Sequence, residues 1–126
     1  MDKIYHLALS KEMLEGAQYT LLPGDPFRVE KIAKKIDPES REIAHKREYR
    51  SWLGNINGIP VLVISTGIGG PSTAIAIDEL AKLGVKNFIR VGTSGAIQKD
   101  IQVGDTIITT GSVRLDGAST HYAPVE

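Results

Sequence analysis

The sequence contains no cysteine, which excludes disulfide bonds and thiolate metal sites and is typical of a protein from a reducing compartment. It has no long apolar run: VLVI at 61–64 is far shorter than the roughly 20 residues that a transmembrane helix needs. Neither sign of charge is in excess, because 15 Lys and Arg residues balance 15 Asp and Glu residues. Without a basic field, nucleic acid is not an expected partner, and any anion site must be local.

The amino-terminal stretch MDKIYHLALSKEM has charges close to both sides of its apolar residues and no small-residue cleavage site. It therefore does not read as a signal peptide. Together with the missing transmembrane run, this predicts a soluble, cytoplasmic protein without a membrane partner. The length of 126 residues predicts a single domain, 1–126, that can bury a hydrophobic core.

Glycine and proline separate the apolar segments and so predict the order of the secondary structure. One helix is expected to begin at Pro26, and a second to begin within GIGGPS (67–72) and end near Gly84. The pair Asn57-Gly58 predicts a hairpin turn. Strands are expected at 19–22, 59–66, 87–91 and 104–115, and an extended polar stretch at 41–56. This alternation predicts an α/β fold with a central mixed, mostly parallel β-sheet flanked by helices.

Unusual polar chemistry follows three of the expected strands. The segments are LLPGDPFR (21–28), ISTGIGGPS (64–72) and IRVGTSGA (89–96). In open α/β sheets, ligands bind beyond the carboxyl ends of the strands. We therefore expect the three segments to converge on one edge of the sheet.

Arg28 falls in the first turn of the expected helix, where the helix dipole disfavours a cation. The preceding Gly24 lets the backbone turn tightly and present N–H groups, and a helix N-terminus with an added arginine suits an anion. The simpler interpretation is a solvated Arg28 that pairs with Asp25 or Glu30.

Arg90 ends a short strand that reads as buried, and no acidic residue is near it in sequence. A charge removed from water must face a counter-ion. Thr93 adds a hydroxyl group, while Gly92 and Gly95 permit close backbone approach. Two arginines, a hydroxyl and glycine N–H groups favour a phosphate pocket. The alternative is a purely structural domain in which a distant carboxylate neutralises Arg90.

Other kinds of site fit less well. GIGGPS has Ser72 where a dinucleotide fingerprint needs glycine, and no P-loop sequence is present. The three histidines are scattered without zinc-ligand spacing. Ser94 lacks the spacing of a nucleophile elbow, so no covalent enzyme intermediate is expected.

The motifs together resemble the nucleoside phosphorylase family, through essentially the whole chain. LLPGDPFRVEKIA (21–33) and IRVGTSGA (89–96) are typical of the wider family, which includes purine nucleoside phosphorylases and nucleosidases. GIGGPST (67–73) and RLDGAS (114–119) are more specific and favour the branch that acts on uridine. The resemblance implies reversible phosphorolysis: a pyrimidine ribonucleoside and phosphate give the base and ribose 1-phosphate.

The resemblance also implies roles for individual residues. Phosphate would be bound by Gly24, Arg28, Arg90 and Thr93, and by Arg47 reaching from the neighbouring subunit. His6 would cross a dimer interface to the ribose 5′-hydroxyl, Thr93 would also approach the ribose, and Ser94 and Gly95 would approach the base. Glu48, Ile68 and Ser72 match positions that hold a potassium ion between subunits in some relatives. No other cofactor is implied, and the expected assembly is a homo-oligomer, a hexamer built from dimers.

Family members continue well past the point where this sequence stops. We therefore expect residues 1–126 to be the amino-terminal part of a longer phosphorylase, with the phosphate half of the site but not the base half, and to be inactive alone. The alternatives are a purine nucleoside phosphorylase and a non-catalytic phosphate- or nucleoside-binding module.

Overall fold

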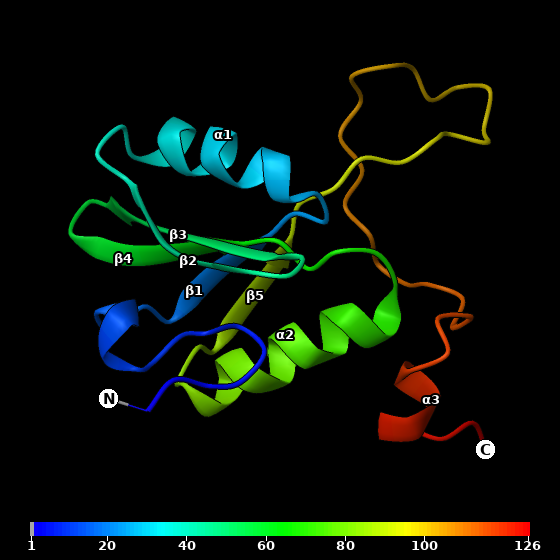
Figure 1. Ribbon diagram of the computed structural model, residues 1–126. Coiled ribbons are helices and arrows are strands. Elements are labelled where there is room, and N and C mark those ends of the chain that lie inside the picture. The colour runs from blue at the N-terminus through cyan, green and yellow to red at the C-terminus, as the bar shows by residue number, and fades with distance from the viewer. Residues whose placement is uncertain (1) are drawn as a thin grey trace.

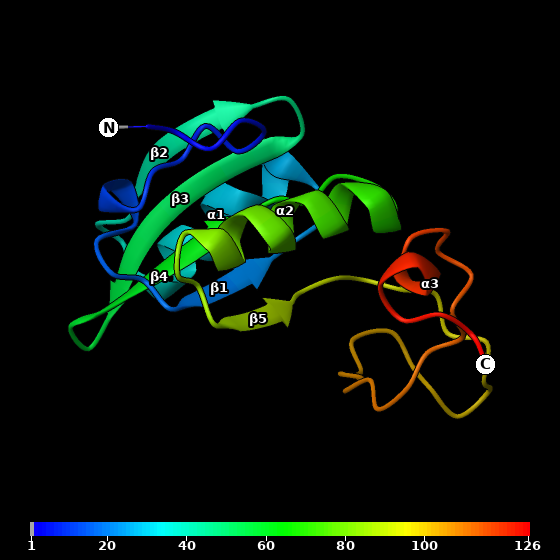
Figure 2. The same cartoon turned by 90° about the horizontal axis from the view of Figure 1, so that it is seen from below.

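The computed structural model describes residues 2–126 and contains one five-stranded sheet between two long helices (Figure 1). Helix α1 covers one face of the sheet and α2 covers the other, as the view from below also shows (Figure 2). The elements in chain order are a 3-10 helix, η1 (Glu12–Leu14), then β1 (Tyr19–Leu22), α1 (Pro26–Ile36), β2 (Arg41–Lys46), β3 (Tyr49–Ile56), β4 (Ile59–Ile64), α2 (Gly70–Lys82), β5 (Asn87–Arg90) and α3 (Ser119–Tyr122).

The sheet has the strand order β2-β3-β4-β1-β5 and is mixed, as predicted. Strand β1 runs parallel to both of its neighbours, with Tyr19 opposite Val61 of β4 and Asn87 of β5. Strands β2, β3 and β4 form an antiparallel meander. The β3–β4 turn is the predicted Asn57-Gly58 pair, and both residues have the positive φ that this hairpin turn requires. The parallel part therefore consists of β4, β1 and β5.

Helix α1 begins where the sequence predicts. The Asp25 carboxylate accepts a hydrogen bond from the backbone N–H of Phe27 at 2.9 Å, and Pro26 occupies the first turn. The helix ends at Ile36, because Asp37 precedes a proline and adopts an extended conformation. Its apolar face includes the fully buried Val29 and Ala33, which pack on the sheet beside Trp52 and Val63.

The larger core lies on the other face of the sheet, under α2 and the amino-terminal segment. Leu62 and Ile64 of β4 are fully buried there and pack with Ala76 and Leu80 of α2. The core also contains Leu7, Leu9, Leu14, Ala17, Leu22, Tyr49, Leu53 and Val85. This packing fixes the carboxyl ends of β1 and β4 relative to both helices.

Two sequence predictions are wrong. Residues 104–115 form no strand, although their β-branched residues favour one, because no neighbouring strand within residues 2–126 offers them hydrogen-bonding partners. The strand at 87–91 exists, as β5, but it is not buried: it lies at the edge of the sheet, and Ile89 and Arg90 are exposed. Among the described residues, no helix has the length and apolar composition needed to cross a bilayer.

Candidate functional site

The three polar segments that follow β1, β4 and β5 do converge on one edge of the sheet. Beyond the strand ends, the backbone N–H of Gly67 donates to the carbonyl of Gly24 at 3.0 Å. The N–H of Val91 donates to the carbonyl of Leu22 at 3.1 Å. The convergence follows from the parallel pairing of β4, β1 and β5, which puts their carboxyl ends side by side.

Arg28 and Arg90 meet over Gly24. A Cβ atom on Gly24 would lie 3.2 Å from Nη2 of Arg90 and 3.9 Å from Nη2 of Arg28. It would also lie 3.4 Å from the carbonyl oxygen of Gly67. A Cβ atom at position 24 would therefore crowd the Arg90 guanidinium group and reach ordinary contact with that of Arg28, whereas glycine leaves the space open.

Neither guanidinium group forms an ion pair with any residue from 2 to 126. Arg90 donates through Nη1 to the carbonyls of Leu22 and Val91, at 3.0 and 2.7 Å. The simpler interpretation of Arg28 is wrong within these residues, since Asp25 caps α1 and Glu30 pairs with Lys34 and Arg50. Two cations thus lie side by side without a protein counter-ion, a favourable place for an anion.

An open pocket of about 620 Å³ lies beside the arginine pair. Its lining residues are Gly24, Asp25, Pro26, Glu48, Gly67, Ile68, Ser72 and Arg90. Five of these were singled out in the sequence as phosphate or cation ligands, although they come from segments that are far apart in the chain. Arg28 does not line the pocket but reaches its rim over Gly24.

Glu48 and Ser72 form the polar wall of this pocket. The Ser72 hydroxyl donates to the Glu48 carboxylate at 2.9 Å and contacts the carbonyl of Thr66. The Tyr49 hydroxyl donates to the backbone carbonyl of Ser72 at 2.8 Å. The pKa of Glu48 is lowered because its own backbone N–H and the Ser72 hydroxyl donate to it, assisted by the charge of Arg47. Oxygen atoms with one negative charge suit a monovalent cation, so these residues fit the implied potassium ion.

Thr93, Ser94 and Gly95 do not line the arginine pocket. All three are exposed and line a different hollow, between residues 92–96 and 101–107. This segment leaves the sheet after β5 and extends away from it (yellow to orange in Figure 1). The segment begins next to the arginine pair, since a Cβ atom on Gly92 would lie 2.9 Å from Nη1 of Arg90. The ribose and base roles of Thr93, Ser94 and Gly95 stay predictions.

His6 and Arg47 both pack against Tyr5. Arg47 lies in the β2–β3 turn, exposed, with its guanidinium carbon 5.9 Å from the centre of the Tyr5 ring. The His6 ring packs edge-on against the same tyrosine, with 4.9 Å between ring centres. Neither residue lines the arginine pocket of its own chain.

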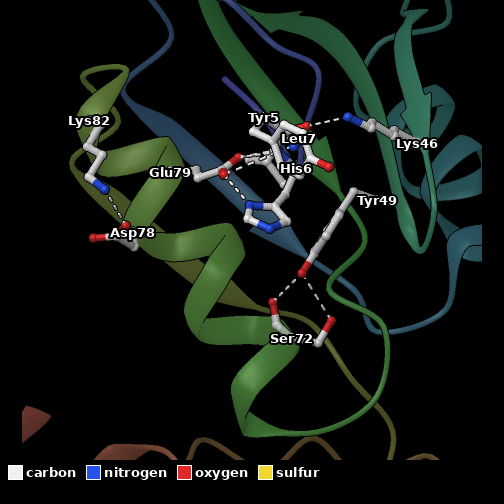
Figure 3. A network of polar contacts seen from close by, with 9 residues as sticks. All are labelled: Tyr5, His6, Leu7, Lys46, Tyr49, Ser72, Asp78, Glu79 and Lys82. Carbon is white, nitrogen blue, oxygen red and sulfur yellow. Dashed lines mark hydrogen bonds and ion pairs between the residues drawn. The ribbon is translucent and has the colours of Figure 1, made fainter. Parts of the chain in front are cut away.

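Sequence reasoning missed Glu79, whose buried carboxylate is bonded to His6 (Figure 3). The signal was present in the spacing of α2. Glu79 follows Ile75 by four residues and Ala76 by three, so it lies on the apolar stripe of the helix. A carboxylate on a buried helix face needs polar partners, and this one finds them in the amino-terminal segment.

Comparison with known proteins places these features in a family. Residues 18–126 match the model described as the phosphorylase superfamily. The chain is 57% identical to a uridine phosphorylase of Haemophilus influenzae, over 100% of this chain and 50% of the relative. It is 55% identical to a uridine phosphorylase of Escherichia coli, over 98% of this chain and 48% of the relative.

A relative with a different name is also similar. A guanosine phosphorylase of Halorubrum lacusprofundi is 43% identical over 86% of this chain and 45% of its own length. The chain thus spans about half the length of the curated relatives that it matches.

Proposed function

The chain belongs to the phosphorylase superfamily, and from that premise we propose that its protein catalyses the reversible phosphorolysis of uridine to uracil and ribose 1-phosphate. The observation that carries the proposal is the arginine pair over Gly24, which is free of carboxylate partners within residues 2–126. These residues would supply the phosphate half of the site. The rest of the length found in the relatives would supply the base half.

The arrangement suits phosphate as a nucleophile. Phosphate attacks weakly, so a site gains most by holding it in line with the anomeric carbon and away from water. Arg28 and Arg90 can bind the dianion through several N–H donors. As the glycosidic bond breaks, positive charge develops on the ribose, and the adjacent dianion stabilises it. A phosphate oxygen forms the new bond to the anomeric carbon, and the base departs with the electrons of the broken glycosidic bond. The proton that hydrogen phosphate gives up, directly or through solvent, neutralises the departing base.

Thr93, Ser94 and Gly95 would complete the site beside the ribose and the base. In the structure they line a hollow that begins at Gly92, where a Cβ atom would lie 2.9 Å from Nη1 of Arg90. Arg47 and His6 would serve the site of a neighbouring subunit in a hexamer built from dimers. Arg47 is exposed, as is about a third of the His6 side chain, and neither residue lines the pocket of its own chain, which supports this assignment.

A potassium ion would bind at the Glu48 and Ser72 oxygens, with Ile68 supplying its backbone carbonyl. Ile68 lines the same pocket, and its side chain is almost fully exposed. Such an ion would neutralise Glu48 next to the bound phosphate and thereby lessen the repulsion between the two anions.

The test uses the protein expressed from its complete reading frame, with uracil release measured at varied phosphate concentrations. We expect release to require phosphate and to saturate with it. Arg90→Ala and Arg28→Ala should each lower kcat/KM for phosphate about 10- to 100-fold, the loss typical of a charged hydrogen bond. Lys31→Ala is the matched control, because Lys31 is an exposed cation one turn further along α1.

Three results would count against the proposal. They are no uracil release by the unaltered protein, release independent of phosphate, and equal losses in the Lys31 and Arg90 variants. Residues 1–126 alone should release no uracil, because relatives of the uridine phosphorylase type are about twice as long.

A purine substrate is the second candidate, favoured by the similarity to the guanosine phosphorylase. Both activities use the same phosphate chemistry, so the arginine variants do not separate them. Competition between uridine and guanosine for the complete protein does. A higher kcat/KM for guanosine would replace the uridine proposal and leave the phosphate site intact.

A further inference from the structure

Glu79 holds the amino-terminal segment through three polar groups. Only 7% of its surface is exposed, and its carboxylate accepts hydrogen bonds from the backbone N–H groups of His6, at 3.2 Å, and Leu7, at 3.0 Å. The third contact joins Glu79 Oε1 to Nδ1 of the His6 ring at 2.5 Å. Figure 3 shows the ring directly beside the carboxylate, with its second nitrogen turned away from it.

The chemistry of these contacts fixes the proton on the histidine ring. Burial raises the pKa of Glu79, but the bonds from the His6 ring and from the backbone N–H groups of Leu7 and His6 outweigh it, so the pKa lies below its ordinary value. The carboxylate is therefore ionised at neutral pH and can only accept. Nδ1 of His6 must then carry a hydrogen, and in the neutral ring Nε2 is left as an acceptor.

Neighbouring side chains fix the orientation of the His6 ring. Tyr5 packs edge-on against His6, and Lys46 lies 4.3 Å from the centre of the tyrosine ring while its ammonium donates to the Tyr5 carbonyl at 2.5 Å. About a third of the His6 side chain remains exposed. The ring is thus fixed on one side and open on the other, so a ligand can reach Nε2.

We propose that Glu79 is a positioning residue, which orients His6 and fixes its tautomer so that Nε2 accepts a hydrogen bond from a sugar hydroxyl bound by a second copy of the chain. The inference rests on the proposed function for the identity of the ligand. The tautomer of the His6 ring does not depend on the proposed function, because the contacts with Glu79 define it. A purely structural Glu79 would need only the two backbone contacts.

The first test is spectroscopic and needs no substrate. In the complete protein with ¹⁵N-labelled histidine, His6 is assigned by the signal that His6→Phe removes. We expect the Nδ1–H tautomer for the unaltered protein, recorded at a pH at which the spectrum shows the ring to be uncharged. The Nε2–H tautomer, or a mixture of the two, would overturn the proposal, whether or not the protein phosphorolyses uridine.

Glu79→Gln sharpens this result. Glutamine has one oxygen, which the backbone N–H groups of His6 and Leu7 require, so its NH₂ group would face Nδ1. The proton should then move to Nε2, and an unchanged tautomer would contradict the proposal. Asp78→Asn is the matched control: Asp78 precedes Glu79 on α2, pairs with Lys82 at 2.7 Å on the surface, and has no contact with His6.

The second test is kinetic and compares uridine with 5′-deoxyuridine. Glu79→Gln should lower kcat/KM for uridine about 3- to 10-fold, the worth of one neutral hydrogen bond, and should change it less than about twofold for the analogue that lacks the hydroxyl. In a His6→Ala background the same substitution should add no further loss. Equal losses on both substrates would show a structural role only, and would leave the proposed phosphorolysis standing.

Discussion

Residues 2–91 and residues 92–126 both contain large apolar side chains, but the first region buries them and the second leaves most of them exposed. The first region holds all five strands, both long helices and the whole buried core. The second holds only the four-residue α3, and its large apolar side chains, such as Ile108 and Leu115, are mostly exposed. It touches α2 through Asp116, whose carboxylate lies next to Gly70.

The difference shows that a β-branched sequence forms a strand only where a neighbour supplies hydrogen bonds. VLVI of β4 has β3 and β1 on its two sides, whereas residues 104–115 have no such neighbour within the part of the chain described. The candidate site is divided at the same boundary. Arg28, Arg90 and Ser72 belong to the packed region, whereas Thr93 and Ser94 belong to the extended one.

The largest difference in the free energy of unfolding is expected between substitutions of core and of exposed apolar residues. Leu62→Ala should lower the free energy of unfolding by about 2–5 kcal/mol, because it empties a fully enclosed position in β4. Ile108→Ala removes a side chain of similar size that is 85% exposed, and should change it by less than about 0.5 kcal/mol. Urea denaturation of the 126-residue chain measures both. A large loss for the Ile108 variant would break the comparison, since it would mean that residues 92–126 pack in this chain in solution.

A smaller contrast is expected between two glycines. A Cβ on Gly67 would lie 2.7 Å from Cγ of Glu48, and Gly67 has a φ of +71°. Gly67→Ala should therefore cost about 1–3 kcal/mol through overpacking and strain. A Cβ atom on Gly111 would have no atom within 4 Å, so Gly111→Ala should change the free energy of unfolding by less than about 0.5 kcal/mol. Equal melting temperatures for the two variants would show that Glu48 moves aside without cost.

The smallest difference concerns how the stability cost of replacing two arginines, Arg50 and Arg114, depends on pH. Arg50 bonds the Glu42 carboxylate at 2.5 Å, which lowers the pKa of Glu42 below 4.5. Because the pKa is lowered on folding, the ion pair stabilises the fold fully above pH 4.5. This contribution is lost as the pH falls through the folded-state pKa of Glu42. Because Glu42 is partly exposed, Arg50→Gln should cost about 0.5–1 kcal/mol at pH 7 and progressively less below pH 4.5.

Arg114→Gln is the comparison from the extended region. Arg114 donates to the Ser119 hydroxyl and the Ala123 carbonyl, which do not titrate. Its replacement should therefore have the same small effect at every pH. A cost for Arg50→Gln that stays constant between pH 7 and pH 3 would contradict the ion-pair explanation.

The sequence predicted well where the signal is local. The start of α1 at Pro26 needs only a capping residue and a proline, and the β3–β4 turn needs only Asn57 and Gly58. The meeting of Arg28 and Arg90 was also predictable, because parallel strands end on one edge. The first two inferences require no knowledge of distant neighbours, and the third requires only that the strands run parallel.

The errors have the opposite character. The exposure of Arg90 depends on β5 being the outermost strand, and the fate of residues 104–115 depends on which strand lies beside them. Strand order and edge position are set by long-range packing, and hydrophobic periodicity carries no information about that packing. The roles of Thr93, Ser94 and the Glu48 oxygens in ligand binding stay predictions.

The pairing of β1 with β5 has a consequence for how this chain acquires its fold. The contact between Leu22 and Arg90 spans 68 positions, so the edge strand closes a long loop, a step that is slow and costly in entropy. The two guanidinium groups come together only once that loop has closed. An anion bridging them would therefore favour the folded chain by mass action, with about 1.4 kcal/mol for each tenfold rise in concentration above Kd. Cellular phosphate would then act as a folding ligand for the outermost strand.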